Sequence, residues 1–144
     1  MKISTRGRYA IRVLLDLAAH NNGEYIPLMD IAKRQEISEK YLESIVSVLS
    51  KNKFVTALRG KGGGYRLARD PGQYTIGSIL RLTEGSLAPV SCLESSEAVS
   101  CDRIDNCRTL PMWRGLDELI NNYLDNITLA DLVQPDEQWS NYVI

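Results

Sequence analysis

The chain has 144 residues, of which 44% are hydrophobic and 24% are charged, a balance typical of one globular unit with an appendage rather than of a disordered tail. Its apolar runs are short and interrupted by charges, so the sequence predicts neither a membrane-spanning helix nor the apolar stretch of a secretory signal. We therefore expect a cytoplasmic protein without a membrane partner. In that reducing compartment, three cysteines favour metal binding or redox sensing over a structural disulfide.

Charge is divided unevenly along the chain, although the net charge is only −1. Residues 1–81 hold 14 Lys and Arg against 7 Asp and Glu, a balance of +7, whereas residues 82–144 hold 3 against 11, a balance of −8. Such asymmetry is expected when one end of a protein faces a polyanion, and ordinary solvated surfaces are an equally good explanation.

A first helix is predicted after a Ser-Thr pair that can cap it, because apolar residues recur at helical spacing as far as Ala18. Its first turn carries Lys2, Arg6 and Arg8, positive charges at the end where the helix dipole disfavours them. A bound phosphate would explain these charges, and so would a solvated face. We predict that Lys2, Thr5 and Arg6 contact DNA.

Two further helices are predicted, a short one over residues 28–35 and a second one capped by Ser38. The apolar face predicted for the second helix comprises Tyr41, Leu42, Ile45, Val46 and Leu49. Two short helices joined by a tight turn form a helix-turn-helix, although spacing alone is a weak signal for it.

A β-hairpin is predicted directly after the second helix, with strands over residues 54–59 and 64–68 around a glycine turn. This order of elements is that of a winged helix, and the predicted wing carries Arg59, Lys61 and Arg66. The glycine run lacks the Lys-Ser/Thr ending of a phosphate-binding loop, which argues against nucleotide binding.

The residues of the second helix that lie outside its apolar stripe form the outward face of a predicted recognition helix. It comprises Ser38, Lys40, Glu43, Ser44 and Ser47, with Tyr41 at the boundary. Serine and lysine reach phosphates or base edges, whereas Glu43 can only accept hydrogen bonds, which suits the amino group of cytosine and repels phosphate. We predict that Glu43 discriminates between sites; the alternative is that it simply points to solvent.

A helix capped by Thr75 and ending at Glu84 precedes the cysteine segment, and a longer helix begins near Pro111. Along the longer helix, apolar residues recur at coiled-coil spacing, which predicts a homodimer seam. Its predicted members are Trp113, Leu116, Ile120, Tyr123 and Ile127. Packing of this stripe onto the core of its own chain is the alternative. A capping box at Thr128 predicts a final short helix.

The predicted fold is mainly α with a small β-hairpin: a winged helix-turn-helix head plus a long dimerisation helix. We expect a DNA-binding domain over residues 1–84, a cysteine-containing sensor loop over residues 85–109, and the dimerisation helix with a C-terminal segment over residues 110–144.

The three cysteines, Cys92, Cys101 and Cys107, form the pattern Cys-x8-Cys-x5-Cys in a polar segment. This pattern indicates a metal site or incidental cysteines. Zinc is a weaker choice of metal, because structural zinc sites usually contain a Cys-x2-Cys knuckle that is missing here.

Four stretches resemble a family of bacterial winged-helix regulators that contains the iron–sulfur cluster regulator IscR, the nitric-oxide sensor NsrR and the cysteine-metabolism repressor CymR. These stretches are MKISTRGRYA at residues 1–10, SEKYLE at 38–43, RGKGGGY at 59–65 and NITLADL at 126–132. The resemblance extends over almost the whole chain, with the wing, the cysteines and the final helices in the family's order.

The resemblance implies a homodimeric regulator that binds double-stranded DNA under the control of an iron–sulfur cluster held by the three cysteines. It further implies that Glu43 disfavours one class of site when the cluster is absent and that Arg59 enters the minor groove, where negative potential attracts arginine. We expect a [2Fe–2S] cluster, with [4Fe–4S] as an alternative, and control of cluster-biogenesis genes.

The fourth cluster ligand departs from the family pattern. The family's histidine position is Leu110 here, and the position of an aspartate that ligates across subunits is Arg8. Neither side chain can ligate iron. Carboxylates of the cysteine segment that could do so are Glu94, Glu97, Asp102 and Asp105, and a partner subunit or a small molecule could also supply the ligand.

The rival interpretation is a cluster-free repressor of sulfur metabolism that is controlled by a partner enzyme or by thiol oxidation. A cluster-assembly or sulfur-metabolism protein is therefore a partner to consider. An enzyme is not expected, because the single histidine, His20, has no visible coupling to a cysteine and no paired catalytic carboxylates occur.

Overall fold

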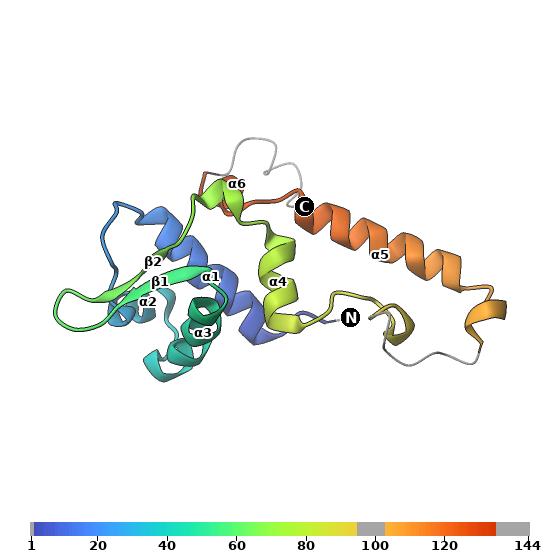
Figure 1. Ribbon diagram of the computed structural model, residues 1–144, viewed down its shortest axis with the longest axis horizontal. Helices are drawn as coiled ribbons and strands as arrows, with labels where there is room; N and C mark the ends of the chain where they lie inside the picture. The colour runs from blue at the N-terminus through green and yellow to red at the C-terminus, as the bar shows by residue number, and fades with distance from the viewer. Residues whose placement is uncertain (1, 95–102, 135–144) are drawn as a thin grey trace.

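The computed structural model describes residues 2–94 and 103–134, and within them it is mostly helical with one two-stranded antiparallel sheet (Figure 1). The helices and strands are α1 (Thr5–Ala19), α2 (Leu28–Gln35), α3 (Glu39–Lys51), β1 (Val55–Leu58), β2 (Gly64–Leu67), α4 (Ile76–Glu84), α5 (Leu110–Asp125) and α6 (Leu129–Val133). This confirms the predicted fold class. None of these helices combines the length and the apolar character needed to cross a bilayer.

Helix α1 runs through the middle of the head and contacts α2, α3, α4, α6 and β2. Its apolar stripe, which includes Val13, Leu14 and Leu17, is at most 1% exposed. Burial of this stripe against the neighbouring helices supplies most of the stability that such short helices lack in isolation.

Polar side chains fix where the helices begin. Ser4, Ser38, Thr75 and Thr128 each accept a hydrogen bond from a backbone N–H in the first turn of α1, α3, α4 and α6. Each bond satisfies a donor that has no partner inside the helix. The predicted caps at Ser38, Thr75 and Thr128 are confirmed.

Strands β1 and β2 pair in the register Val55↔Leu67 to Leu58↔Gly64 and form the predicted wing. Gly60 and Gly62 in the connecting turn have positive φ, a conformation that residues other than glycine rarely adopt. The wing is attached to the head by a backbone bridge between Ile26 and Tyr65, with both N–H to O distances 2.8 Å.

Helix α5 extends away from the head, and the chain after its C-terminal end returns to the head (Figure 1). An antiparallel bridge joins Thr75 to Thr128, and the Ile76 N–H donates to the carbonyl of Ile127 at 2.8 Å. Leu129 at the start of α6 is fully buried in the core of the head. The segment after α5 therefore packs within the head rather than beside it.

Tyr41 lies at the boundary of the apolar face of α3, as predicted, and not inside that face. Tyr41 is 37% exposed, whereas its neighbour Leu42 is fully buried. The helical angle places Tyr41 at the edge of the buried stripe, where its ring meets the ring of Tyr9 edge to face at 5.7 Å.

Candidate nucleic-acid interface and cysteine segment

The predicted outward face of α3 is exposed along its whole length. Its members are Ser38, Lys40, Glu43, Ser44 and Ser47, and all are open to solvent. The buried side chains of Leu42, Ile45 and Leu49 lie on the opposite face and fix the rotation of the helix. Side chains on such a face can reach base edges and phosphates without disturbing the core.

A groove of about 640 Å³ separates α3 from the wing and brings together Glu43, Ser47 and Arg59. Glu39 and Lys51 line it as well. These two residues were missed in the sequence, although the spacing of four residues through 39, 43, 47 and 51 follows one helix face. The groove thus carries carboxylates near the start of α3 and a cation near its end.

A second hollow, of about 400 Å³, lies between α1 and α3 and is bordered by Thr5, Ser38 and Tyr41. Arg6 connects this region to the recognition helix, since its Nη2 donates to the carbonyl oxygen of Ser44 at 3.4 Å. The structure therefore brings the start of α1 and the recognition helix into one surface.

The remaining predicted DNA contacts lie outside the groove and outside the hollow between α1 and α3. Lys40 on α3 and Lys61 in the wing turn are exposed. Lys2 borders a different hollow, together with Glu84 at the end of α4. These exposed cations add the positive charge that attracts a phosphate backbone.

Elsewhere on the head, an ion pair between a buried carboxylate and a partly exposed arginine joins α1 to α2. Asp16 is 3% exposed and accepts two bonds from Arg34, at 2.7 and 3.0 Å, and one from the Gln35 amide at 3.0 Å. Burial opposes ionisation, but the hydrogen bonds and the charge of Arg34 hold the pKa of Asp16 below its ordinary value. The pair thus holds α2, the first helix of the helix-turn-helix, against α1.

Two of the three cysteines lie within the described residues, and Cys101 lies outside them. Cys92 and Cys107 are half-buried free thiols on the connection between α4 and α5. The Cys107 Sγ lies 3.2 Å from the Thr109 Oγ1, and hydrogen bonds from Thr109 lower the pKa of the Cys107 thiol. Thiolates are the usual ligands of iron–sulfur clusters, so the donor chemistry of these residues fits such a group.

Within residues 2–94 and 103–134, no three His, Cys, Asp or Glu side chains gather as a metal site. Among the carboxylates considered as a fourth ligand, Glu94 and Asp105 are exposed, whereas Glu97 and Asp102 lie outside the described residues. Leu110 is only 5% exposed, so the position of the family's histidine holds a packed apolar side chain. His20 ends α1, where its Nδ1 donates to the Asp16 carbonyl oxygen at 2.8 Å.

The predicted dimer seam is divided between two faces of the segment that contains α5. Ile120 and Ile127 pack against the core of the head, together with Leu124. Trp113 is half-buried, and Leu116 and Tyr123 are exposed, at 39% and 55%. The head-facing residues therefore follow the alternative named above for this stripe.

A second apolar stripe on α5 faces solvent in the described residues. Its members are Met112, Leu116, Leu119 and Tyr123, which are 55%, 39%, 69% and 55% exposed. Their spacings of four, three and four residues are those of one helix face. Such a contiguous exposed stripe is unusual for a monomer and typical of an interaction surface.

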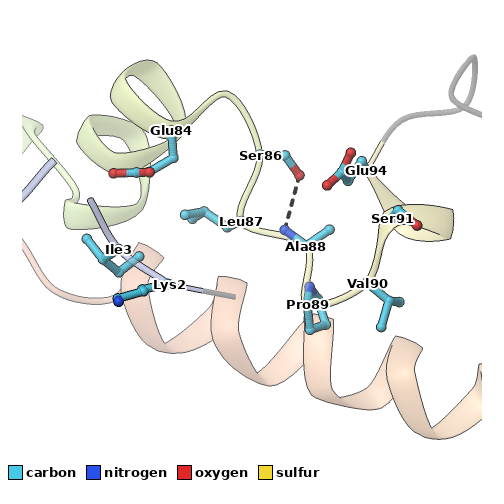
Figure 2. Close-up of a pocket in the computed structure, with 10 residues that line it drawn as sticks. All are labelled: Lys2, Ile3, Glu84, Ser86, Leu87, Ala88, Pro89, Val90, Ser91 and Glu94. Carbon is cyan, nitrogen blue, oxygen red and sulfur yellow. Dashed lines mark hydrogen bonds between the residues drawn. The ribbon is translucent and has the colours of Figure 1, made fainter. Parts of the chain in front are cut away.

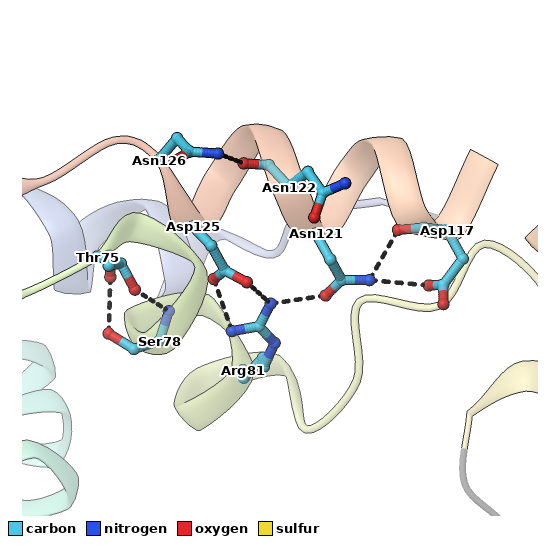
Figure 3. A network of polar contacts seen from close by, with 8 residues as sticks. All are labelled: Thr75, Ser78, Arg81, Asp117, Asn121, Asn122, Asp125 and Asn126. Carbon is cyan, nitrogen blue, oxygen red and sulfur yellow. Dashed lines mark hydrogen bonds and ion pairs between the residues drawn. The ribbon is translucent and has the colours of Figure 1, made fainter. Parts of the chain in front are cut away.

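The orientation of α5 on the head is fixed by a polar network (Figure 3). The guanidinium of Arg81 on α4 donates two bonds of 2.8 Å to Asp125 and one of 2.6 Å to the Asn121 side chain. A bidentate arginine–carboxylate pair fixes direction as well as distance. The network thus sets which face of α5 meets the head and which faces solvent.

The helix-turn-helix, the basic wing, the exposed recognition face and the cationic start of α1 together define a winged-helix, DNA-binding transcription regulator. Residues 3–135 match the family model of the Rrf2 proteins, described as iron-dependent transcriptional regulators. The chain belongs to the Rrf2 family, which consists of transcription regulators rather than enzymes.

Named relatives and solved structures agree with this assignment. The HTH-type transcriptional regulator IscR of Serratia proteamaculans is 41% identical over 133 residues, which cover 92% of this chain and 79% of that protein. CymR, the global cysteine regulator of B. subtilis, has a TM-score of 0.77 at 32% identity, covering 92% and 96% of the two chains. T. potens IscR has a TM-score of 0.72 at 34% identity, covering 100% and 92%.

Proposed function

We propose that the protein is a homodimeric regulator whose promoter binding is controlled by an iron–sulfur cluster held by Cys92, Cys101 and Cys107. The observation that carries this proposal is the position of the described thiols. Cys92 and Cys107 are free, partly accessible, and lie on the connection between the DNA-binding head and α5. A group bound there would act at the junction of the head and the proposed dimer helix.

Double-stranded DNA would be bound by the exposed face of α3 together with the wing and the start of α1. The side chains proposed for this role are Lys2, Thr5, Arg6, Ser38, Lys40, Tyr41, Glu43, Ser44, Ser47, Arg59 and Lys61. The shared groove of Glu43, Ser47 and Arg59 supports simultaneous contact by helix and wing. We propose genes of iron–sulfur cluster biogenesis as targets, as the resemblance to IscR implies.

The second subunit would pack on the exposed stripe of α5. We propose that Met112, Leu116, Leu119 and Tyr123 form the centre of that interface, since they are the large apolar side chains that α5 leaves exposed. Trp113, which is half-buried, would lie at its edge. Leu116 and Tyr123 keep the role predicted from the sequence.

The cluster would be of the [2Fe–2S] type, with a fourth ligand other than cysteine. A cluster with such a ligand is more easily lost or attacked than one held by four thiolates, which suits a sensor. Glu94 and Asp105 are the exposed carboxylates of the described cysteine segment. Cluster delivery would require an assembly protein as a transient partner.

Anaerobic purification tests the proposal. We expect a coloured protein with iron and sulfide bound, and loss of both in Cys92→Ala. Ser91→Ala is the matched control, because it changes the neighbouring side chain of the same short helix and removes no thiol. A colourless wild-type protein without iron or sulfide would reject cluster control.

A cluster-free repressor is the second candidate, and the likeness to B. subtilis CymR favours it. The buried leucine at position 110 agrees with it, because this residue cannot complete a cluster site. In that case the wild-type protein binds DNA with the same affinity whether or not iron and sulfide are supplied.

A further inference from the structure

The last residue of α4, Glu84, is bonded to Ser4, the residue that caps α1 (Figure 2 shows Glu84 near Lys2 and Ile3). The Glu84 Oε1 accepts from the Ser4 backbone N–H at 3.1 Å and from the Ser4 hydroxyl at 2.6 Å. A carboxylate that accepts two bonds forms a stronger contact than a neutral acceptor. These bonds join two parts of the chain that are 80 residues apart.

Ser4 in turn caps α1, because its Oγ accepts from the backbone N–H of Gly7 at 3.1 Å. The side chains beside it are Lys2, Thr5 and Arg6, all exposed and all proposed DNA contacts. Lys2 precedes Ser4 in the chain, and Thr5 and Arg6 follow it. By holding Ser4, the Glu84 carboxylate therefore fixes the position of these three proposed contacts.

The two helices meet without free space at this point. A Cβ added to Gly7 would lie 2.3 Å from the Glu84 Oε1, 3.1 Å from the Thr83 Oγ1 and 3.2 Å from the Leu80 Cδ2. The nearest of these atoms belongs to the Glu84 carboxylate itself, so a side chain at position 7 would displace the carboxylate that bonds Ser4. The close packing of α1 on the end of α4 supports a coupling between the two helix ends.

The chain beyond Glu84 leads directly into the cysteine segment. Leu87, which is 4% exposed, anchors that segment in the core of the head. A hollow of about 260 Å³ is lined by Lys2 and Ile3 on one side and by residues 84, 86–91 and 94 on the other. Cys92 thus lies within a segment that borders the N-terminal residues.

We propose that Glu84 is a positioning residue that holds the DNA-contacting start of α1 through Ser4 and transmits to it the state of the cysteine segment. The second half of this inference rests on the proposed control by a cluster. The first half requires only DNA binding.

Duplex binding by the full-length protein tests the first half. The probe is a 30-base-pair duplex selected from a random library with the wild-type protein, titrated at several salt concentrations. Loss of the bond in Ser4→Ala or Glu84→Ala is expected to weaken binding about tenfold, the order of a charge-assisted hydrogen bond. It should also lower the salt slope by roughly one phosphate contact.

Coupling between the two residues separates positioning from ordinary damage. Both substitutions remove the bond between the Ser4 hydroxyl and Glu84, so the loss in the double variant Ser4→Ala/Glu84→Ala is expected to be clearly smaller than the sum of the two single losses. Each single variant also loses one contact of its own, the Gly7 cap in Ser4→Ala and the Ser4 N–H bond in Glu84→Ala. Glu84→Gln keeps an acceptor and should recover most of the affinity, and Ser4→Ala alone tests the loss if Glu84→Ala does not fold. Additive losses, or an unchanged salt slope, would overturn the assignment.

Loss of the Glu84 charge and loss of its positioning role should change DNA affinity in opposite directions. Removing a carboxylate near DNA should by itself strengthen binding, so weakening in Glu84→Ala reports lost positioning. Glu118→Gln is the matched control, because this exposed carboxylate of α5 lies outside the contact and should leave affinity within about twofold. A loss in Glu118→Gln equal to that in Glu84→Ala would count against the proposal.

The second half is tested by comparing Cys92→Ala with the wild-type protein under anaerobic conditions. If the segment acts through Glu84, the affinity ratio of the two proteins is expected to approach one when both carry Glu84→Ala. A ratio that persists overturns the coupling and leaves cluster control intact. A ratio of one in the wild-type background, with no bound iron, rejects cluster control and the coupling, and the salt-slope result for Ser4 and Glu84 still stands.

Discussion

At the scale of single residues, Asp16 is the charged group that the head buries most deeply. An isolated buried carboxylate would be strongly unfavourable, and here Arg34 and Gln35 supply three hydrogen bonds to it. The sequence signal for this contact is only an aspartate between Leu15 and Leu17, inside an otherwise apolar stripe. Its partner is 18 residues away on another helix, which helical spacing cannot identify.

The substitution Asp16→Asn should lower the free energy of unfolding by about 1 to 3 kcal/mol, because it replaces charge-assisted hydrogen bonds at a buried carboxylate with weaker ones. Glu24→Gln is the control, since Glu24 is an exposed carboxylate outside the pair, and should change stability by about 0.5 kcal/mol or less. Denaturant unfolding at pH 7 measures both. Equal effects of the two substitutions would show that the buried pair contributes nothing particular.

The same pair predicts a pH dependence. Burial would raise the pKa of Asp16, but hydrogen bonds from Arg34 and Gln35 lower it below the ordinary value of 3.8. Because the folded pKa is the lower one, the stabilisation is complete from about pH 5 upward. It is lost progressively as the pH falls through 3.8 and then through the folded pKa. The stability difference between wild type and Asp16→Asn should therefore shrink as the pH falls below about 5, and a constant difference would contradict the argument.

Glu43 is the residue on the recognition face that should govern site choice. Its carboxylate lies in the groove between α3 and the wing, where it accepts from donors and repels phosphate. Glu43→Ala should raise affinity for poor sites by about 5- to 100-fold, a discrimination of roughly 1 to 3 kcal/mol. Competition binding over a panel of duplexes measures this, with Glu24→Ala as an exposed control outside that groove. Unchanged relative affinities would refute the role.

At the scale of elements, local signals were sufficient wherever one residue fixes a boundary. Ser38 and Thr75 predict the starts of α3 and α4, because a hydroxyl at that point satisfies a free backbone N–H. The wing follows from its glycine turn in the same way. Tyr41 could be placed only at a boundary, because an aromatic ring at the edge of a buried stripe is compatible with either environment.

The wing should contact DNA through an arginine. Arg59 borders the groove shared with α3, and an arginine on a wing is attracted to the negative potential of the minor groove. Arg59→Ala should weaken duplex binding about tenfold or more and lower the salt slope by roughly one unit. Lys33→Ala on α2 is the control, an exposed cation away from the groove lining. Equal losses in both variants would indicate a loss of net charge rather than of a specific contact.

The rotation of α5 shows what periodicity alone leaves undecided. The sequence offers two interleaved apolar stripes, one through Ile120 and Ile127 and one through Leu119 and Tyr123. Both have helical spacing, so the pattern cannot decide which stripe meets the head. The polar contact of Arg81 with Asp125 decides it, and this contact joins residues 44 apart in the sequence.

At the scale of the whole molecule, the proposed dimer should depend on Leu119, the most exposed member of the stripe at 69%. Leu119→Glu places a charge at the proposed interface and should shift a dimer to monomers by at least tenfold in dissociation constant. Sedimentation measures the shift. Arg114→Glu is the control, because it places a glutamate at an exposed position outside the stripe and makes the chain even more negative than Leu119→Glu does. An unchanged dimer would place the interface elsewhere.

The bridge between Thr75 and Thr128 joins the two ends of the segment that runs through α4, the cysteines and α5. A single cut within this segment should therefore leave both fragments associated. Leu129 and the Arg81–Asp125 pair would hold the C-terminal fragment on the head without a covalent link. A protease site inserted after Glu94, once cleaved, should yield two polypeptides that co-elute under native conditions and separate in denaturant. Because the Arg81–Asp125 pair and the Thr75–Thr128 bridge both lie at its C-terminal end, α5 should stay attached to the head after the cut.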